Sequence, residues 1–587
     1  MRWSLDALYP SFESAEFKAD YQRVGTEIEK MEKWAKEALT SVENPVNKIE
    51  AYLHMNISFS NLITRLLSFA ELSVSVDAKN ERALKIIDQL ENSLTRLTEP
   101  EVLFQNWLGN LSDLESLISA SPLLEEHRFY LMELKEQTKY LLSEKEEVII
   151  SKMKNTGSGA WSKLQELLTS TLLVNIKIDG VEKQLPLPVI RNLAYEKDAA
   201  LRQNAYEAEL KAYEKIVDSS AAALNGIKGE VITLAELRGY QSPLEMTLKN
   251  ARMDQEILDA MLTAMKESLP AFHKFYRKKA ELLGHQNGLP FYDLFAPMGN
   301  ADMRFTYDEA RKFIVDHFRS FSDSLADFAD RAFEEQWIDA EPREGKRGGA
   351  FCANLHVIKE SRVLSNFTGS FSDVTTLAHE LGHAYHGYCL NDESALNSHY
   401  PMPLAETASI FCETIIKNAA LEKASEKEAF AILENDLSDS GQVIVDILSR
   451  YLFETELFKQ REDSTLSVNE LKEMMLNAQK EAYGNGLDHN HLHPYMWVVK
   501  PHYYYASSNF YNFPYAFGLL FAKGLYAEYL QRKDSFVKEY DQLLSVTGKL
   551  SIADVAQTMN IDLRSVDFWR NSLQLIEMDI ETFMQLK

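Results

Sequence analysis

Residues 376–386 read Thr-Leu-Ala-His-Glu-Leu-Gly-His-Ala-Tyr-His, and this stretch decides how the chain is interpreted. Its apolar residues recur at helical spacing, which predicts a buried amphipathic helix. His379 and His383 are four residues apart, so on a helix both imidazoles lie on one face and can reach one metal ion. Glu380 can then act as a base toward a water in the open position of a zinc ion.

The pattern is short, and a core helix with two hydrogen-bonded histidines is the alternative interpretation. Ser372 or Asp373 is expected to cap the helix before Val374. A catalytic zinc ion also needs a third protein ligand. His386 shares the face of His379, but it lies about 10 Å further along the axis, which strains coordination by all three histidines. The longer zinc pattern with Gly at 386 and His at 389 is not met, because these residues are His and Cys.

The segment 404–413 supplies a better third ligand. It is mostly apolar and carries two carboxylates seven residues apart, Glu406 and Glu413. Carboxylates among apolar neighbours are costly to bury unless they are paired or bound to metal. We predict that Glu406 is the third ligand and that Glu413 fixes a ligand histidine through its other ring nitrogen. Asp373 is a weaker candidate for such a supporting role, since a helix cap also explains it.

Composition excludes several classes of function. The 587 residues are 45% hydrophobic and 26% charged, with a formal net charge of −26. Such an acidic chain is unsuited to nucleic acid and to anionic membranes. No secretory signal or transmembrane run is visible, and three cysteines do not suggest a disulfide framework. We therefore expect a cytoplasmic protein with two or more lobes.

The chain reads mainly as helices, expected over 15–39, 48–72, 79–97, 123–142, 189–283, 307–335 and beyond 404. Residues 173–178 alternate in polarity, Asp179-Gly180 follows, and 181–185 completes a predicted hairpin. Pro186 and Pro188 then mark the expected boundary between an N-terminal helical lobe, 1–186, and a catalytic region, 187–587.

Residues 343–371 lack the helical pattern of the preceding segments and are rich in glycine at their start. They predict short strands, at 350–352 and 363–367, beside the motif helix. The edge of a small sheet can hold an extended peptide by main-chain hydrogen bonds, and glycines allow close approach. An ordinary glycine-rich loop is the alternative.

A dense group of histidines and tyrosines follows near the end of the chain. Hydroxyl and imidazole donors are what a hydrolase needs to stabilise an oxyanion, although tyrosine also packs well in cores. The group contains His489, His491, His493, His502, Tyr503, Tyr504, Tyr505, Tyr511 and Tyr515.

Several of these motifs occur together in one family. The chain resembles the oligoendopeptidase F and Pz-peptidase branch of the thimet-oligopeptidase superfamily of zinc metallopeptidases. The matching stretches are 346–352, 366–367, 376–386, 404–409, 501–504 and 513–516.

The resemblance implies a mainly α, two-lobed helical body with a deep central channel and a small β-sheet beside the zinc helix. It implies a cytoplasmic endopeptidase that cuts short oligopeptides and holds one Zn²⁺ per chain. By the same resemblance the metal ligands are His379, His383 and Glu406. The general base is Glu380, and the transition-state donors are His502, Tyr511 and Tyr515. The substrate backbone is aligned by Gly349, Ala350 and Phe351.

Two other functions fit the sequence as well. One is a peptide-binding scaffold without catalysis, although a purely structural zinc site is usually closed by four protein ligands. The other is a metal hydrolase that acts on a non-peptide amide. The sequence leaves the oligomeric state open.

Overall fold

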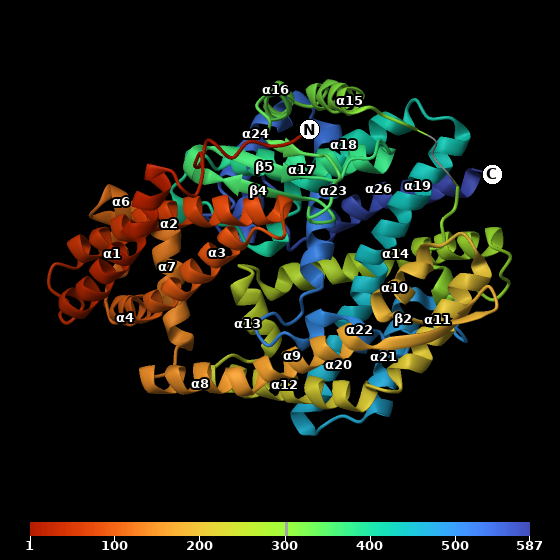
Figure 1. The fold of residues 1–587 in the computed structure, drawn as a ribbon, viewed down its shortest axis with the longest axis horizontal. Coiled ribbons are helices and arrows are strands. Elements are labelled where there is room, and N and C mark those ends of the chain that lie inside the picture. Colours follow the sequence, from red (N-terminus) through yellow and green to blue (C-terminus); the bar gives the residue numbers. More distant parts are fainter. Residues whose placement is uncertain (300–302, 587) are drawn as a thin grey trace. The chain divides into compact units, whose positions relative to one another are not determined.

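The protein is mainly helical, as expected, with two small sheets (Figure 1). The computed structural model describes residues 1–299 and 303–586. Contacts between residues divide the chain into two compact units. Unit 1 comprises Met1–Leu141, Asp302–Ala420 and Glu528–Ile561, and unit 2 comprises Leu142–Ala301, Leu421–Ala527 and Asp562–Lys587.

Unit 1 begins with a group of helices whose apolar faces bury Leu8, Ile28, Leu66 and Phe69 in one cluster and Leu53, Phe104 and Leu131 in another. Its helices are α1 (Ala15–Ala38), α2 (Pro45–Val76), α3 (Glu81–Leu94), α4 (Thr98–Gly109), α5 (Leu114–Ser119), α6 (Pro122–Glu126), α7 (Arg128–Gln137), α15 (Tyr307–Arg319), α16 (Asp323–Glu334), α17 (Phe371–Cys389), α18 (Thr407–Leu421), α24 (Asp534–Ser545) and α25 (Ile552–Gln557).

Two expected helices of unit 1 are interrupted. The stretch 307–335 forms α15 and α16, because the hydroxyl of Ser322 accepts from the Leu325 N–H and starts a new helix. The stretch 123–142 divides into α6 and α7 at His127, whose ring nitrogen bonds the Leu123 carbonyl. Local polar side chains that compete with the helical ladder thus override the apolar periodicity.

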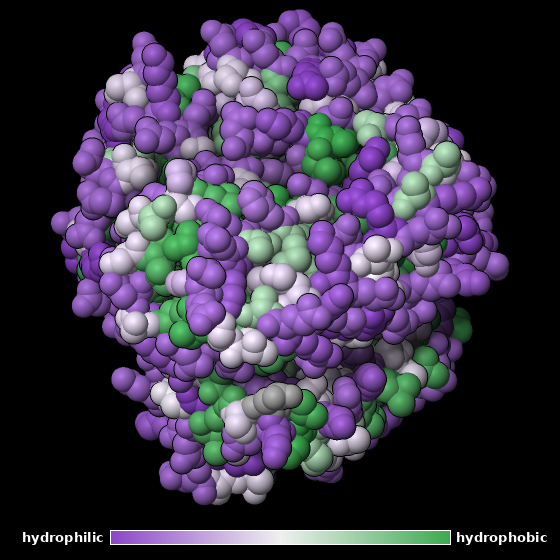
Figure 2. All heavy atoms as spheres, turned by 90° about the vertical axis from the view of Figure 1, so that its left-hand side faces the viewer, coloured by the Kyte–Doolittle hydropathy of each residue, from purple (hydrophilic) through white to green (hydrophobic). Residues whose placement is uncertain are grey.

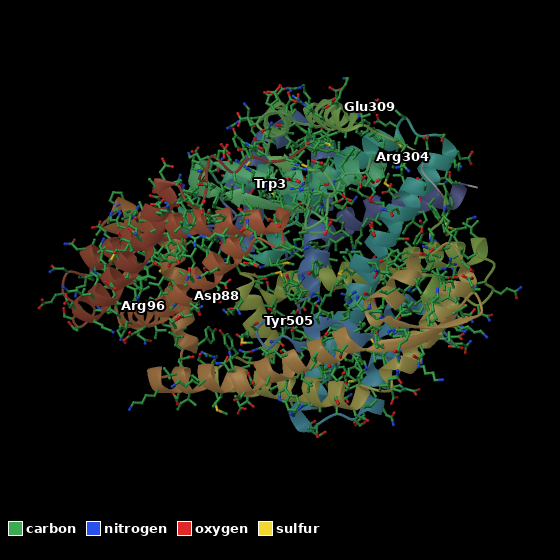
Figure 3. The ribbon with its side chains drawn as sticks, in the orientation of Figure 1. Trp3, Asp88, Arg96, Arg304, Glu309 and Tyr505 are labelled. Carbon is green, nitrogen blue, oxygen red and sulfur yellow. The ribbon has the colours of Figure 1, made fainter. Side chains whose placement is uncertain are left out.

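The sheet of unit 1 has the order β3 (Ile338–Asp339), β5 (Glu360–Leu364), β4 (Phe351–Leu355). β4 pairs antiparallel with β5, and its other edge has no partner strand in the described part of the chain. The N-terminal segment packs on this sheet, where the Trp3 and Phe351 rings lie 6.3 Å apart (Figure 3). The predicted small sheet beside the motif helix is confirmed, and α17 contacts both β4 and β5.

Two glycines of α17 allow its neighbours to approach closely. A Cβ on Gly382 would lie 2.6 Å from the Ala408 carbonyl oxygen and from Ser409 Cα, at the start of α18. A Cβ on Gly387 would lie 2.3 Å from Asn354 Cγ of β4. The helix that carries the motif is therefore fitted directly against a second helix and a strand.

Unit 2 contains the predicted hairpin, β1 (Leu173–Ile178) paired antiparallel with β2 (Val181–Pro186). In its helical core α14 packs on α26, where the Phe275 and Phe583 rings lie 5.3 Å apart. Its helices are α8 (Glu144–Thr156), α9 (Ser158–Thr171), α10 (Leu187–Asn192), α11 (Ala199–Tyr213), α12 (Val217–Arg238), α13 (Pro243–Asn250), α14 (Gln255–Leu282), α19 (Glu426–Gly441), α20 (Ile447–Asp463), α21 (Val468–Tyr483), α22 (Met496–Val499), α23 (Phe513–Arg532) and α26 (Val566–Gln585).

The contact units follow a different division from the one expected at residue 186. Pro186 ends β2, and Pro188 lies in the first turn of α10, within the same unit. Proline at the start of a helix is favoured because its missing N–H has no partner there in any case. The prolines therefore mark the end of one element and the start of the next within unit 2. Each unit is built from three separated segments of the chain.

Polar side chains dominate the molecular face in Figure 2, where apolar residues form only small patches. Among the described residues, no helix combines the length and the apolar character that a membrane span requires.

We predict that Gly382→Ala lowers the free energy of unfolding of unit 1 by about 1–3 kcal/mol, because the added methyl group meets α18 backbone that cannot move aside alone. Gly25→Ala in α1 is the matched control. It has open space around it and should gain about 1 kcal/mol of helix stability. Chemical denaturation of both variants measures the difference, and equal stabilisation by both would contradict the close packing.

Candidate active site

The motif helix α17 begins with a capping box. Ser370 is its N-cap and accepts from the Asp373 N–H, while the Asp373 carboxylate accepts from the Ser370 N–H. The cap is therefore Ser370, and the expectation of Ser372 or Asp373 was wrong by two or three residues. Asp373 also accepts from the N–H and the hydroxyl of Thr368. These bonds give Asp373 a role at the start of the helix, and among the described residues none joins it to His379 or His383.

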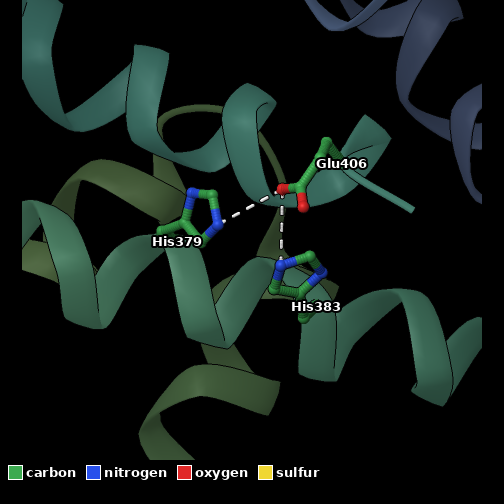
Figure 4. Close-up of side chains that lie close together, drawn as sticks. All are labelled: His379, His383 and Glu406. Atoms are coloured by element: carbon green, nitrogen blue, oxygen red, sulfur yellow. Dashed lines mark ion pairs between the residues drawn. The ribbon is translucent and has the colours of Figure 1, made fainter. Parts of the chain in front are cut away.

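His379, His383 and Glu406 converge, as predicted (Figure 4). The histidines lie one turn apart on α17, and Glu406 directly precedes α18. Glu406 Oε2 is 3.3 Å from His379 Nε2 and 3.5 Å from His383 Nε2. Ligand atoms that surround a tetrahedral zinc ion at about 2.0–2.2 Å lie roughly 3.3–3.5 Å from one another. The donor set thus fits a metal ion in type, and its two distances to Glu406 fit the spacing of zinc ligands.

Neighbouring groups hold each of the three side chains. His379 Nδ1 is 3.1 Å from Glu413 Oε2, so the predicted partner of a ligand histidine is in contact with it. His383 makes a hydrogen bond with the Ala405 backbone. Ser409 Oγ donates to Glu406 Oε2 at 2.7 Å. Such partners fix the orientation of metal ligands.

The charges of the cluster are coupled. Burial opposes ionisation of Glu406, but the hydrogen bond with His379 and the charges of both histidines lower the pKa of its carboxyl to about 2. Burial likewise opposes charge on His379, and hydrogen bonds with Glu406 and Glu413 raise its pKa to about 10. Burial lowers the pKa of His383 to about 4. A metal ion bound here would compete with a proton on His379, because a ligand imidazole must be neutral.

Glu380 is buried beside this cluster, with 6% of its surface exposed. Burial raises the pKa of its carboxyl to about 7. A carboxylate with a pKa near neutrality is suited to exchange protons in both directions at physiological pH.

His386 is separate from the cluster. It is fully buried, its Nε2 bonds Thr547 Oγ1 at 2.8 Å, and its ring stacks on Tyr400. This agrees with the expectation that it is not a third ligand.

Gly349, Ala350 and Phe351 lead into the edge strand β4. Gly349 has a φ of +77° and open space around its Cβ position, and its carbonyl accepts from Asn366 Nδ2 at 2.9 Å. The side chain of Asn354 in β4 donates to the His383 carbonyl at 3.2 Å. A side chain of this edge strand is therefore hydrogen-bonded to the helix turn that carries His383.

His502, Tyr511 and Tyr515 form a second cluster, within unit 2. His502 lies in a 3₁₀ turn (Pro501–Tyr504), and Tyr515 lies in the first turn of α23. The His502 ring is 5.0 Å from the Tyr511 ring and 6.4 Å from the Tyr515 ring, and the tyrosine rings are 5.6 Å apart. Burial, followed by the charges of Arg450 and Lys500, lowers the pKa of His502.

The three preceding histidines have other partners. His489 bonds the Gly484 carbonyl, His491 pairs with Asp488, and buried His493 lies 3.3 Å from Glu209. The sequence grouped all these histidines because they are close along the chain. Only His502 joins the tyrosines.

Sequence reasoning missed three supporting residues: Ser409, Asn354 and Gly382. Ser409 follows Glu406 by three residues, a spacing at which side chains meet on a helix, so this partner was detectable. Asn354 and Gly382 act through contacts between distant segments, which no local pattern reveals.

Comparison with known proteins identifies the family of the chain. The family model described as "Peptidase family M3" matches residues 192–575, and the one described as "Oligopeptidase F" matches 110–173. The chain belongs to peptidase family M3. It is therefore a metallopeptidase, a hydrolase of the oligopeptidase type.

Relatives match the M3 chain over nearly its full length. An oligoendopeptidase F homolog of Lactococcus lactis subsp. lactis (strain IL1403) is 24% identical, and the match covers 98% of this chain and 96% of the relative. A solved structure of a Chlamydophila abortus protein has a TM-score of 0.87 at 23% identity, with 100% and 98% of the two chains covered. That of oligoendopeptidase-F from Enterococcus faecium has a TM-score of 0.73 at 18% identity, with 97% and 98% covered. These structures share the fold.

We predict that three substitutions differ in their effect on zinc affinity. Glu406→Ala should weaken zinc binding most, because it removes a donor atom. Glu413→Ala should weaken it by about 10–100-fold, the usual effect of losing a partner of a ligand. His386→Ala should leave it unchanged. Competition with a chromophoric chelator measures all three. Full zinc affinity in Glu406→Ala, or its loss in His386→Ala, would contradict the ligand set.

Proposed function

We propose that this M3 peptidase is a zinc-dependent endopeptidase that hydrolyses internal bonds of short oligopeptides. The observation that carries the proposal is the convergence of His379, His383 and Glu406, whose ligand atoms lie within 4.8 Å of one another, with buried Glu380 beside them. Two histidines and a carboxylate are a donor set of catalytic zinc sites, and three protein ligands leave a fourth position open.

His379 Nε2, His383 Nε2 and a Glu406 carboxylate oxygen would hold the zinc ion. When bound, zinc supplies a Lewis acid that acidifies a water molecule and polarises the scissile carbonyl. One cluster of this kind occurs among the described residues, which supports one Zn²⁺ per chain.

Glu380 is assigned as the general base. Its carboxylate takes a proton from the attacking water and then delivers it to the amine nitrogen that leaves when the C–N bond breaks. Its buried setting suits both steps, because burial brings the pKa of this carboxyl close to neutrality.

His502, Tyr511 and Tyr515 are assigned to stabilise the developing oxyanion. The phenol hydroxyls of the tyrosines are donors, and a neutral imidazole offers one N–H. The lowered pKa of His502 favours that neutral form.

The free edge of β4, with Gly349, Ala350 and Phe351 at its start, is assigned to align the peptide by main-chain hydrogen bonds. The expectation of a deep channel that admits only short peptides stays a prediction. We also propose a cytoplasmic location. The three cysteines are free, which suits a reducing compartment.

We predict that Glu380→Gln lowers kcat for peptide cleavage by at least about 10²–10⁴-fold, the usual contribution of a general base, while zinc content stays the same. Mass spectrometry of a peptide digest and elemental analysis measure the two quantities. The control is Glu393→Gln, which removes a carboxylate of the same unit that pairs with Lys549. Full activity in Glu380→Gln would rule out the assignment.

A further inference from the structure

A buried ion pair lies beneath the loop that carries Tyr511. Lys228 of α12 and Glu454 of α20 pair at 2.8 Å, and their side chains are 0% and 2% exposed. Neither residue touches His502, Tyr511 or Tyr515 in the contacts of the described chain. The pair therefore has no direct part in the second cluster.

Each member of the pair holds one asparagine of the Tyr511 loop. Lys228 Nζ donates to Asn509 Oδ1 at 2.9 Å, and Asn512 Nδ2 donates to Glu454 Oε2 at 3.0 Å. Both asparagines are 2% exposed. The two charged groups are thus hydrogen-bonded to the residues that flank Tyr511, two before it and one after it.

The loop backbone between these asparagines is also constrained. Phe510 has a φ of +52°, a left-handed conformation that is strained for a bulky side chain and persists only where its surroundings impose it. Its ring packs on Phe458 and Tyr451, with centroids 5.4 and 5.7 Å away. Thr247 Oγ1 donates to the Asn509 carbonyl at 3.1 Å.

The ring of Tyr511 contacts the rings of His502 and Tyr515. Its hydroxyl makes no hydrogen bond within the described residues, so it is available as a donor. Its position depends on the anchored residues on either side.

Stability alone does not account for burying these charges, because well-packed apolar residues often replace a buried ion pair without loss. The hydrogen bonds to two loop residues do explain why the charges are present, since an apolar pair could not form hydrogen bonds with Asn509 and Asn512. We propose that Lys228 and Glu454 are positioning residues that fix Tyr511 for the reaction. This inference rests on the proposed function, in which Tyr511 stabilises the oxyanion.

Unit 2 offers a matched control pair. Lys279 and Glu434 pair at 2.6 Å with side chains 1% and 9% exposed. Lys279 Nζ donates in addition to the Leu294 carbonyl, which is outside the Tyr511 loop. Removing this pair perturbs the core to a similar degree without releasing Tyr511.

The experiment is a double-mutant cycle on peptide cleavage by the full-length zinc enzyme. Lys228→Met/Glu454→Leu is made in the wild type and in Tyr511→Phe, and Lys279→Met/Glu434→Leu is made in both as the control. Tyr511→Phe should lower kcat by about 10²–10³-fold. Loss of the Lys228–Glu454 pair should lower kcat by about 10–100-fold in the wild type with little change in KM, and by much less in Tyr511→Phe.

Each other outcome has a defined meaning. An equal loss in both backgrounds, or an equal loss from the control pair, overturns the positioning role and leaves the proposed function standing. Unchanged kcat in Tyr511→Phe overturns the assigned role of Tyr511 and this inference with it. No peptide cleavage by the wild type overturns the proposed function. If circular dichroism shows that the pair variant is unfolded, Asn509→Ala, which leaves the ion pair intact, takes its place with the same expectations.

Discussion

The candidate site depends on one constraint, the partial burial of two imidazoles and a carboxylate where α17 meets the start of α18. Polar groups removed from water are stable only when they are paired, hydrogen-bonded or bound to metal. Gly382 lets the two helices approach, which brings Glu406 Oε2 within 3.3 Å of His379 Nε2 and 3.5 Å of His383 Nε2. Glu413 and Ser409 complete the hydrogen bonds. Glu380, one residue after His379, is more deeply buried, and its burial raises the pKa of its carboxyl to about 7.

Much of this arrangement could be predicted because its signals are local. The spacing of His379 and His383 implies a shared helix face, and the alternation of 173–178 followed by Asp179-Gly180 implies a hairpin. Glu406 was recognised because a carboxylate in an apolar segment needs a partner. The N-cap of α17, Ser370, lies two residues before Ser372 and three before Asp373, the two caps expected from the sequence; Asp373 resembles a cap because it forms the other half of the capping box.

The rest could not be predicted, because it depends on which distant segments meet. Each unit takes its chain from three separated stretches, whereas Pro186 and Pro188 only end one element and begin another. The tie between Asn354 and the His383 carbonyl spans 29 residues, and that between Lys228 and Asn509 spans 281. The sequence also gave no reason to separate His493 from His502, since the partner of His493 is Glu209, 284 residues away.

The central claim is that this M3 chain uses a zinc ion to cut short peptides internally. The most direct measurement is digestion of a mixture of peptides of graded length, read by mass spectrometry, with and without a chelator. The account predicts internal cuts confined to short peptides, lost with the chelator and restored by zinc. Peptides left intact by protein with a full complement of zinc would contradict it.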